Sequence, residues 1–582
     1  MHQNYHRQFH CKQHRVLLFP SFPDRRIPPT IGMGLPPGPI PRLGLIAKWC
    51  AIAIGRELFS AANDSGEIGN NTSAANLNFP NFLRFFNFCN FLIKPKIWTS
   101  ASPIQYHEHY QPLIGGFMKE ESTFVGLDPQ FEDIGLLSRR GFLGKIVAGT
   151  IASGFVPGVS FAKKAPTGHR VPVAPDNDSY WNHVADQFLI QPGVSYMNTG
   201  TRGPSPRSVY QAQIQSIEQA NTDRFSYASH VYNLEFKSGV RQKLASFVGC
   251  AANEVALTNN TTEGMVVGTF GPDLRKGDEI IYTNHDHSSG GQPINLRCAR
   301  QGTIPVMIDL SSAKFHPPEN PSVIINAFEK AITRRTRMIS FCHVNYTDGC
   351  VLPVKEICEM ARSKGILTLV DGAHPPGMMD LDISDLGCDM YAGAGHKWLL
   401  AGQLTGFLFV RQDIQDRIWP SIYSGPVNGL NLYGEPQSES YLARSQTAEK
   451  YEMHGSTNYS IGITIDAALD FHNAIGQSAI ESRDRYLMER VRAGLEKLPG
   501  AAIFSSTDPR LCAGLISFNI DGIEPKQLSK LLWERHRIYI RNVTHPEINW
   551  DANRASMHIM VTTRQADDLV SAIGEIAKEI NS

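Results

Sequence analysis

Paired cysteines, a dominant charge and long apolar runs are all missing from this 582-residue sequence. Its ten cysteines form no Cys-x-x-Cys pair and its twenty histidines form no His-Glu-x-x-His motif, so we expect no structural metal. Lys and Arg total 55, as do Asp and Glu, which leaves no overall charge to attract nucleic acid. No stretch is apolar and long enough to predict a stable membrane span.

The first 117 residues differ from the rest, because they are rich in His, Pro, Asn and Phe and keep no helical or strand period. We expect residues 1–117 to be a disordered or misassigned extension, with Met118 as the physiological start. An unusual disordered leader is the alternative.

Residues 118–162 resemble a twin-arginine export signal. Arg139 and Arg140 precede a Phe-Leu pair, a mildly apolar run over 146–155 and small residues ending at Ala162. The resemblance implies the twin-arginine export machinery as a partner and a periplasmic or other extracytoplasmic location. A surface helix with two arginines is the alternative, and the protein would then be cytoplasmic. Unchanged localisation after changing both arginines to lysine would contradict export.

Apolar strands and amphipathic helices alternate beyond residue 178, as in an α/β domain. Strands are predicted at 254–257, 279–282, 304–310, 338–344, 366–370 and 404–410. We therefore expect a large, doubly wound, parallel-sheet domain over 178–450. A smaller α+β domain is expected over 451–582, with helices at 461–475 and 479–498, strands at 515–520, 538–541 and 557–561, and a last helix.

Two motifs after predicted strands suggest a cofactor. Asp371 ends the strand Leu367-Thr-Leu-Val, and Lys397 stands in the glycine-rich turn Ala394-Gly-His-Lys. Both fall at strand carboxyl ends, where open α/β sheets bind ligands. Pyridoxal phosphate needs a lysine for its Schiff base and an acid for its ring nitrogen. The pair therefore predicts a pyridoxal phosphate enzyme in which Lys397 also acts as the general base.

These motifs resemble those of the class V aminotransferases, of pyridoxal phosphate fold type I, and within them the isopenicillin N epimerase-like branch. The resemblance covers about residues 180–580 and is most specific at Asp371-Gly-Ala-His-Pro-Pro-Gly377 and His396-Lys397-Trp398. It implies a large doubly wound, mostly parallel-sheet domain and a smaller α+β C-terminal domain. It also implies pyridoxal 5'-phosphate as cofactor, a homodimer, and an amino acid or small peptide as substrate.

The resemblance assigns roles to individual side chains. Thr261, Thr262 and His396 would lie near the cofactor phosphate, His374 near the ring 3-oxygen, and His285 would stack on the ring as a catalytic residue, with His287 in reserve. Ser456, in Gly455-Ser456-Thr457-Asn458, would reach the phosphate in the neighbouring subunit. Arg554 and Asn198 would bind the substrate, Arg554 through the substrate carboxylate. Asn198 lies in the segment Tyr196-Met-Asn-Thr-Gly200 that opens the family pattern. A structural histidine or a plain helix cap is the alternative at several of these positions.

The sequence departs from the related cysteine desulfurases at two points. No cysteine follows Arg541, since the chain continues Asn-Val-Thr-His545-Pro, and this disfavours desulfuration through a protein persulfide. Tyr346 stands where those enzymes have an asparagine. We expect reaction at the substrate α-carbon, by an epimerase or aminotransferase. The alternatives are a carbon–sulfur lyase of the same fold and a binding protein without catalysis.

Overall fold

The computed structural model describes residues 173–226, 234–311, 317–455, 458 and 460–581, all within one compact unit, Pro157–Ser582. The predictions for residues 1–117 and for the twin-arginine segment lie outside the described residues.

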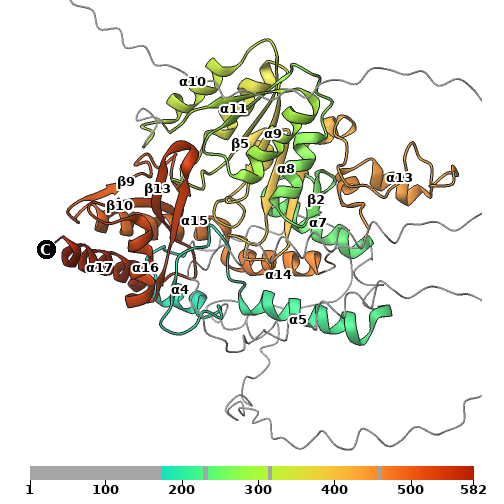
Figure 1. Cartoon of the computed structure of the whole chain (residues 1–582). Coiled ribbons are helices and arrows are strands. Elements are labelled where there is room, and N and C mark those ends of the chain that lie inside the picture. Colours follow the sequence, from blue (N-terminus) through green and yellow to red (C-terminus); the bar gives the residue numbers. More distant parts are fainter. Residues whose placement is uncertain (1–172, 227–233, 312–316, 456–457, 459, 582) are drawn as a thin grey trace, which may run out of the picture. The chain divides into compact units, whose positions relative to one another are not determined.

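A seven-stranded sheet forms the centre of the first part of this unit (Figure 1). Six strands are parallel to one another, and only β8 runs antiparallel to both of its neighbours. The predicted mostly parallel α/β fold is thus confirmed. The strands, in spatial order, are β2 (Val255–Thr258), β8 (Gly406–Val410), β7 (Met390–Ala394), β6 (Leu367–Gly372), β5 (Thr336–Cys342), β3 (Glu279–Thr283) and β4 (Ile304–Ile308).

Helices cover both faces of this sheet, so its central strands are buried on both sides. Because side chains alternate along a strand, Leu369 of β6 joins the apolar core beneath one face and Val370 joins the core beneath the other. One core includes α8 (Thr261–Phe270) and α9 (Ser288–Gln301). The other includes α5 (Arg207–Thr222), α7 (Leu234–Val248), α10 (Pro321–Ala331), α11 (Val354–Ser363) and α14 (Ile461–Ile475).

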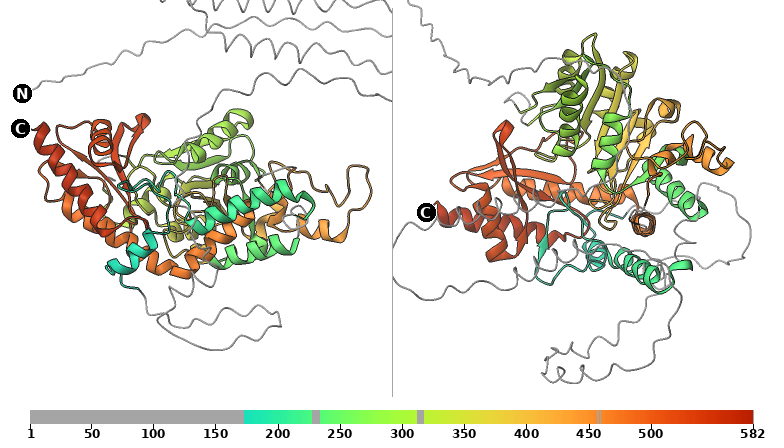
Figure 2. Two further views of the ribbon diagram at one scale, coloured as in Figure 1. Left: turned by 90° about the horizontal axis from the view of Figure 1, so that it is seen from below. Right: turned by 45° about the vertical axis from the view of Figure 1, so that its right-hand side comes forward.

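The C-terminal part contains a four-stranded antiparallel sheet in the order β12 (Arg541–His545), β13 (Trp550–Ser556), β10 (Leu515–Ile520) and β9 (Ala501–Ile503). Helices α15 (Gln477–Leu495), α16 (Pro525–His536) and α17 (Thr563–Ile580) pack with it. Helix α14 instead contacts α5 and α7, alongside which it lies in both views of Figure 2. The domain boundary near residue 451 stays a prediction.

Two of the predicted C-terminal strands are wrong in extent. Residues 557–561 are buried but form no strand, whereas the preceding Trp550–Ser556 form β13. The buried positions of β13 include polar Asn553 and Arg554, which interrupt the apolar alternation typical of a strand. The strand expected at 538–541 is also divided, because Ile538–Tyr539 (β11) pairs with Ser195–Tyr196 (β1) while Arg541 begins β12.

Among the described residues, no helix is long and apolar enough to cross a membrane. No group of three or more His, Cys, Asp or Glu side chains among them is arranged to hold a metal ion.

Candidate active site

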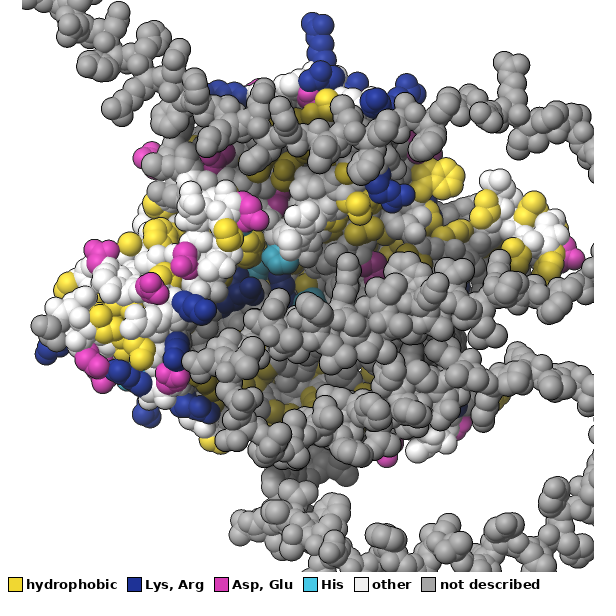
Figure 3. All heavy atoms as spheres, in the orientation of Figure 1, with side chains coloured by type: hydrophobic (Ala, Val, Ile, Leu, Met, Phe, Trp, Pro, Cys, Tyr) yellow, Lys and Arg dark blue, Asp and Glu magenta, His cyan; other side chains and the backbone are white. Residues whose placement is uncertain are grey.

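Lys397 and Asp371 meet in one pocket at the carboxyl ends of adjacent strands. β6 and β7 pair in parallel, with Asp371 opposite Ala392, and Lys397 follows the end of β7. Both residues line a cavity of about 190 Å³ together with side chains from α8, β5 and β13. In the space-filling view, histidines lie next to Lys and Arg side chains near the middle of one face (Figure 3). The sheet therefore brings together the two residues on which the cofactor prediction depends.

The surroundings of Lys397 lower the pKa of its amine, so the neutral form is more populated than in water. Although Lys397 keeps some solvent contact, loss of water around the amine lowers its pKa to about 8; Asp371 opposes this shift, and Arg554 and Arg541 add to it. Asp371 is buried, which raises its pKa, while Lys397 favours its charged form. Its Oδ1 accepts a hydrogen bond of 3.0 Å from the amide of Ala373, which fixes the carboxylate.

The N-terminus of α8 forms one end of the pocket and is suited to a phosphate. Asn260 is the N-cap and accepts from the amide of Glu263, so the Thr hydroxyls are not used for capping. Thr261 Oγ1 is buried without a hydrogen-bond partner among the described residues, and Thr262 also lines the pocket. Helix N-termini bind anions through free amides and the helix dipole. His396 lines the same pocket, with Nδ1 3.3 Å from the carbonyl of Thr405.

His374 directs a hydrogen-bond donor to the pocket. Trp398 Nε1 donates to His374 Nδ1 over 3.0 Å, and burial lowers the pKa of His374 well below its ordinary value. A neutral imidazole that accepts at Nδ1 has its proton on Nε2. This Nε2 is buried and has no partner among the residues described. It is therefore suited to an acceptor atom of a bound ligand, such as a ring oxygen.

The structure places His287, rather than His285, in the pocket. His285 is fully buried outside the lining, with Nδ1 2.6 Å from Thr347 Oγ1. Asp286 fixes this turn, because its carboxylate accepts from the amides of Thr283 and Cys342, each over 2.8 Å. The backbone therefore turns His285 inward and leaves His287 at the pocket. The predicted position of His285 at the cofactor ring is therefore wrong, and stacking of the reserve residue, His287, on the ring stays a prediction.

Arg554 of β13 is a buried member of the pocket lining. Its Nη1 donates to the carbonyl of Tyr346 over 2.7 Å, and its Nη2 donates to Thr201 Oγ1 over 3.0 Å. Asn198 does not line the pocket, but its Oδ1 lies 3.4 Å from Arg554 Nη2, and a direct contact of Asn198 with substrate stays a prediction. Burial and the neighbouring Arg541 lower the pKa of Arg554, although a guanidinium stays charged at neutral pH. Ser456 lies outside the described residues.

Several pocket residues were not among the predicted site residues. Arg541, Tyr346, Cys342, Ser289 and Thr201 all contribute to the lining. Arg541 begins β12 and lies directly opposite Arg554 of β13, a pairing that local sequence does not show. Thr201 and Tyr346 lie in loops, whereas Cys342 ends β5 and Ser289 belongs to α9. Which of these side chains reach the pocket depends on tertiary packing.

Two buried histidines contact the backbone of the loop that carries Lys397, here called the lysine loop. The carbonyl of Trp398 lies 3.0 Å from His558 Nε2 and 3.1 Å from His472 Nε2. Burial lowers the pKa of His558 to about 3 and raises that of Asp484, 2.7 Å from its Nδ1, well above the ordinary value. Burial thus disfavours the charged form of each group, and because the Trp398 carbonyl can only accept, His558 Nε2–H donates to it.

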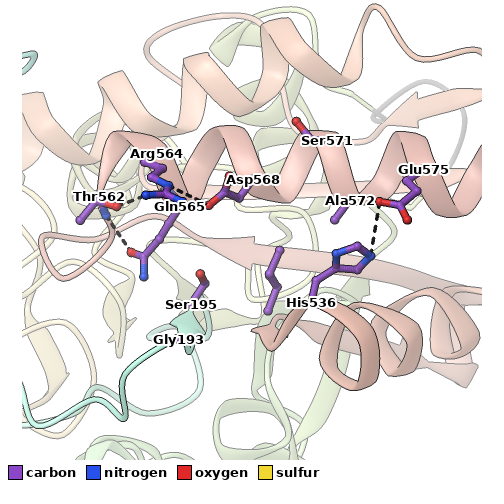
Figure 4. A pocket seen from close by; sticks show the side chains of 11 residues that line it. Gly193, Ser195, His536, Thr562, Arg564, Gln565, Asp568, Ser571, Ala572 and Glu575 are labelled. Atoms are coloured by element: carbon purple, nitrogen blue, oxygen red, sulfur yellow. Dashed lines mark hydrogen bonds and ion pairs between the residues drawn. The ribbon is translucent and has the colours of Figure 1, made fainter.

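A second hollow, of about 610 Å³, lies between β1, β11 and α17 (Figure 4). It is larger than the lysine pocket, but its polar groups mostly interact with one another. Thr562 and Gln565 form a reciprocal capping box at the start of α17. Arg564 Nε lies 3.7 Å from Asp568, and His536 Nε2 lies 4.0 Å from Glu575. We therefore assign the chemistry to the smaller pocket, which contains Lys397 and Asp371.

With this geometry, comparison with known proteins gives the class. Residues 198–569 match the family Aminotransferase class-V, which is most of the chain. The chain belongs to this family, and its cofactor is pyridoxal 5'-phosphate. The pocket fits this cofactor, since Thr261 Oγ1 and His374 Nε2 are buried lining atoms without partners among the described residues.

Individual relatives differ in activity. The chain is 28% identical to isopenicillin N epimerase of Streptomyces clavuligerus over 407 residues, covering 69% of this chain and 99% of that protein. It is 29% identical to a probable cysteine desulfurase of Methanothermobacter thermautotrophicus, covering 66% and 94%. Among solved structures, a cysteine desulfurase from Thermococcus onnurineus superposes with a TM-score of 0.60 at 21% identity, covering 68% and 98%, which supports the fold.

Proposed function

We propose that this chain is an enzyme that moves a proton at the α-carbon of an amino acid or small peptide, as an epimerase or aminotransferase does. The observation that supports this most is Lys397, whose pKa is lowered to about 8 in the pocket that it shares with Asp371. An amine that is partly neutral near physiological pH can accept a proton, and an ordinary surface lysine cannot do so efficiently.

Each pocket residue has a separate task in this proposal. Bound pyridoxal phosphate supplies a ring that accepts the electrons released when a bond at the substrate α-carbon breaks. Lys397 would hold the cofactor and, as a free amine, would take up and return the α-proton. Asp371 would pair with the ring nitrogen, and His374 Nε2–H would donate to the ring oxygen. Arg554 orients the substrate through its carboxylate, for which a guanidinium is geometrically suited.

The pocket gives less support to desulfuration through a protein persulfide. Cys342 is the one cysteine that lines the pocket among the described residues. Burial, and the nearby carboxylates of Asp286 and Asp371, raise its pKa well above the ordinary value. The thiolate, not the thiol, is the nucleophile, so Cys342 is poorly suited to attack sulfur. A lyase that releases sulfur without a protein cysteine remains the alternative.

Proton movement can be measured directly in deuterated water. We expect the full-length protein to show a visible absorbance band that borohydride abolishes, and to catalyse exchange of the α-proton of its substrate, followed by NMR. Lys397→Ala should reduce exchange by roughly 10² to 10⁴. Lys355→Ala, which removes an exposed lysine paired with Asp385, should not change it.

The products separate the remaining alternatives. Formation of the opposite enantiomer indicates epimerisation, and a keto acid with a modified cofactor indicates transamination. Pyruvate with sulfide or persulfide from a sulfur amino acid would replace the proposal by the lyase. A normal cofactor band with no exchange and no product from any amino acid would indicate a binding protein.

A further inference from the structure

Two arginines face each other across the antiparallel sheet at the pocket. In the pairing of β12 with β13, Arg541 is directly opposite Arg554. Side chains at opposed positions lie on the same face with Cβ atoms about 5 Å apart, and like charges there are destabilising. Thr201 Oγ1 accepts from Arg541 Nη1 over 2.8 Å and from Arg554 Nη2 over 3.0 Å. The two guanidinium groups are therefore immediate neighbours.

Neither guanidinium has a carboxylate partner in the part of the chain that the structure describes. Both line the pocket, and neither forms an ion pair there with Asp or Glu. Asp371 is the only acid in the lining, and it interacts with Lys397. The nearby Glu547 is already bound to His545 Nδ1 over 2.8 Å. Two adjacent cations thus stand in one site without a countercharge from these residues.

The two arginines differ in depth. Arg554 is 1% exposed and fixed by three acceptors, whereas Arg541 is exposed at the mouth and has one hydrogen bond, to Thr201. The Tyr346 ring borders the same mouth, between His287 and His545. A ligand with one carboxylate at Arg554 would extend its other end toward Arg541.

We propose that Arg541 binds a second anionic group of the substrate, so that the preferred substrate is an amino acid with a carboxylate on its side chain. This inference rests on the proposed function only in its claim that the substrate carries an amino group. The pair of arginines would bind a dicarboxylate without any amine. A charge-assisted, bidentate contact gives Arg541 its selectivity, because guanidinium and carboxylate match in shape.

The probe is a series of linear dicarboxylates from malonate to adipate, each compared with its monoamide, with binding to the holoenzyme measured by calorimetry. We expect one dicarboxylate to bind roughly tenfold to a hundredfold more tightly than its monoamide. Arg541→Gln should reduce this ratio to about one while changing the monoamide affinity less than about threefold, and Arg541→Lys should keep part of it. Arg535→Gln removes an exposed arginine paired with Glu579 and should leave the ratio unchanged.

Two results would overturn the inference. One is a wild-type protein that binds dicarboxylates and monoamides equally. The other is an Arg541→Gln variant, with normal cofactor content, that loses affinity equally for both, since Arg541 would then share the carboxylate of Arg554. The reaction with the substrate amine is tested separately by adding amino acids to the holoenzyme and measuring the change in its visible absorbance band. Glutamate is compared with glutamine, and aspartate with asparagine. Dicarboxylate selectivity without any effect of amino acids on the band would contradict the proposed function and leave the inference intact.

Discussion

At the scale of residues, the protonation of Lys397 is set by its neighbours. Loss of water, Arg554 and Arg541 favour the neutral amine, and Asp371 favours the ammonium. Only the neutral amine is a nucleophile. The pKa of about 8, compared with an ordinary value of 10.5, therefore determines the pH at which the cofactor-free protein captures pyridoxal phosphate.

We predict that the capture rate rises about tenfold per pH unit below pH 8 and levels off above it, because the neutral fraction of Lys397 follows its pKa. Stopped-flow absorbance measures this rate, with a free lysine derivative as reference for the cofactor's own ionisation. Asp371→Asn removes the charge that stabilises the ammonium, so its rate should level off at a lower pH. A rate that still rises near pH 10 in the wild type would contradict this electrostatic account.

The sequence identified Lys397, Asp371, Thr261, Thr262, His374, His396 and Arg554 as site residues, and the structure brings all of them to one pocket. It could not choose between His285 and His287. That choice depends on hydrogen bonds from Asp286 to the amides of Thr283 and Cys342, and the second of these lies on another strand. Local sequence contains no information on such a long-range contact.

At the scale of elements, the loop after β7 depends on close backbone packing. Gly377 has φ +89°, and a Cβ there would lie 2.4 Å from the carbonyl oxygen of Trp398. The same carbonyl accepts from buried histidines, so it has little freedom to move. Gly365, after α11, has φ +67° but open space around its Cβ position. The two glycines thus share a left-handed backbone and differ in steric contact.

Gly365→Ala should cost about 1 kcal/mol of unfolding free energy, from backbone strain alone. Gly377→Ala should cost more, because the new methyl collides with the backbone of the lysine loop, and only this variant should release cofactor faster. Urea unfolding and dialysis of the holoenzyme measure the two effects. Equal destabilisation of both variants, with unchanged cofactor release, would show that the contact with Trp398 does not position Lys397.

Elements with a clear apolar period were the most predictable. Helix 461–475 and strand 515–520 were predicted with the observed bounds. Strand β13 was missed because polar Asn553 and Arg554 occupy buried positions on it and interrupt the apolar pattern. The antiparallel direction of β8 was also not evident, since a buried strand has the same composition in either direction.

At the scale of the whole molecule, residues 419–447, here called the arm, expose large apolar side chains. Leu432 is 94% exposed and Tyr433 is 83% exposed, and Trp419, Ile422 and Val427 are also largely exposed. Helix α13 (Glu439–Ser445) lies in the arm, which extends away from the sheet in Figure 1. Clustered apolar exposure of this kind marks interaction surfaces. We propose that a second copy of the chain covers the arm, in agreement with the homodimer implied by the segment 455–458.

A Leu432→Glu, Tyr433→Glu double variant should therefore shift the protein from dimer to monomer, because two carboxylates would be buried without partners at the interface. Sedimentation equilibrium measures the mass. Met307→Glu is the control, since Met307 is 56% exposed on β4, outside the arm, and this variant should remain dimeric. If Ser456 contacts the phosphate in the neighbouring subunit, the monomeric variant should also retain pyridoxal phosphate more weakly. A double variant that stays dimeric would exclude the arm as the interface, and a monomer with full cofactor retention would show that each pocket is complete within one chain.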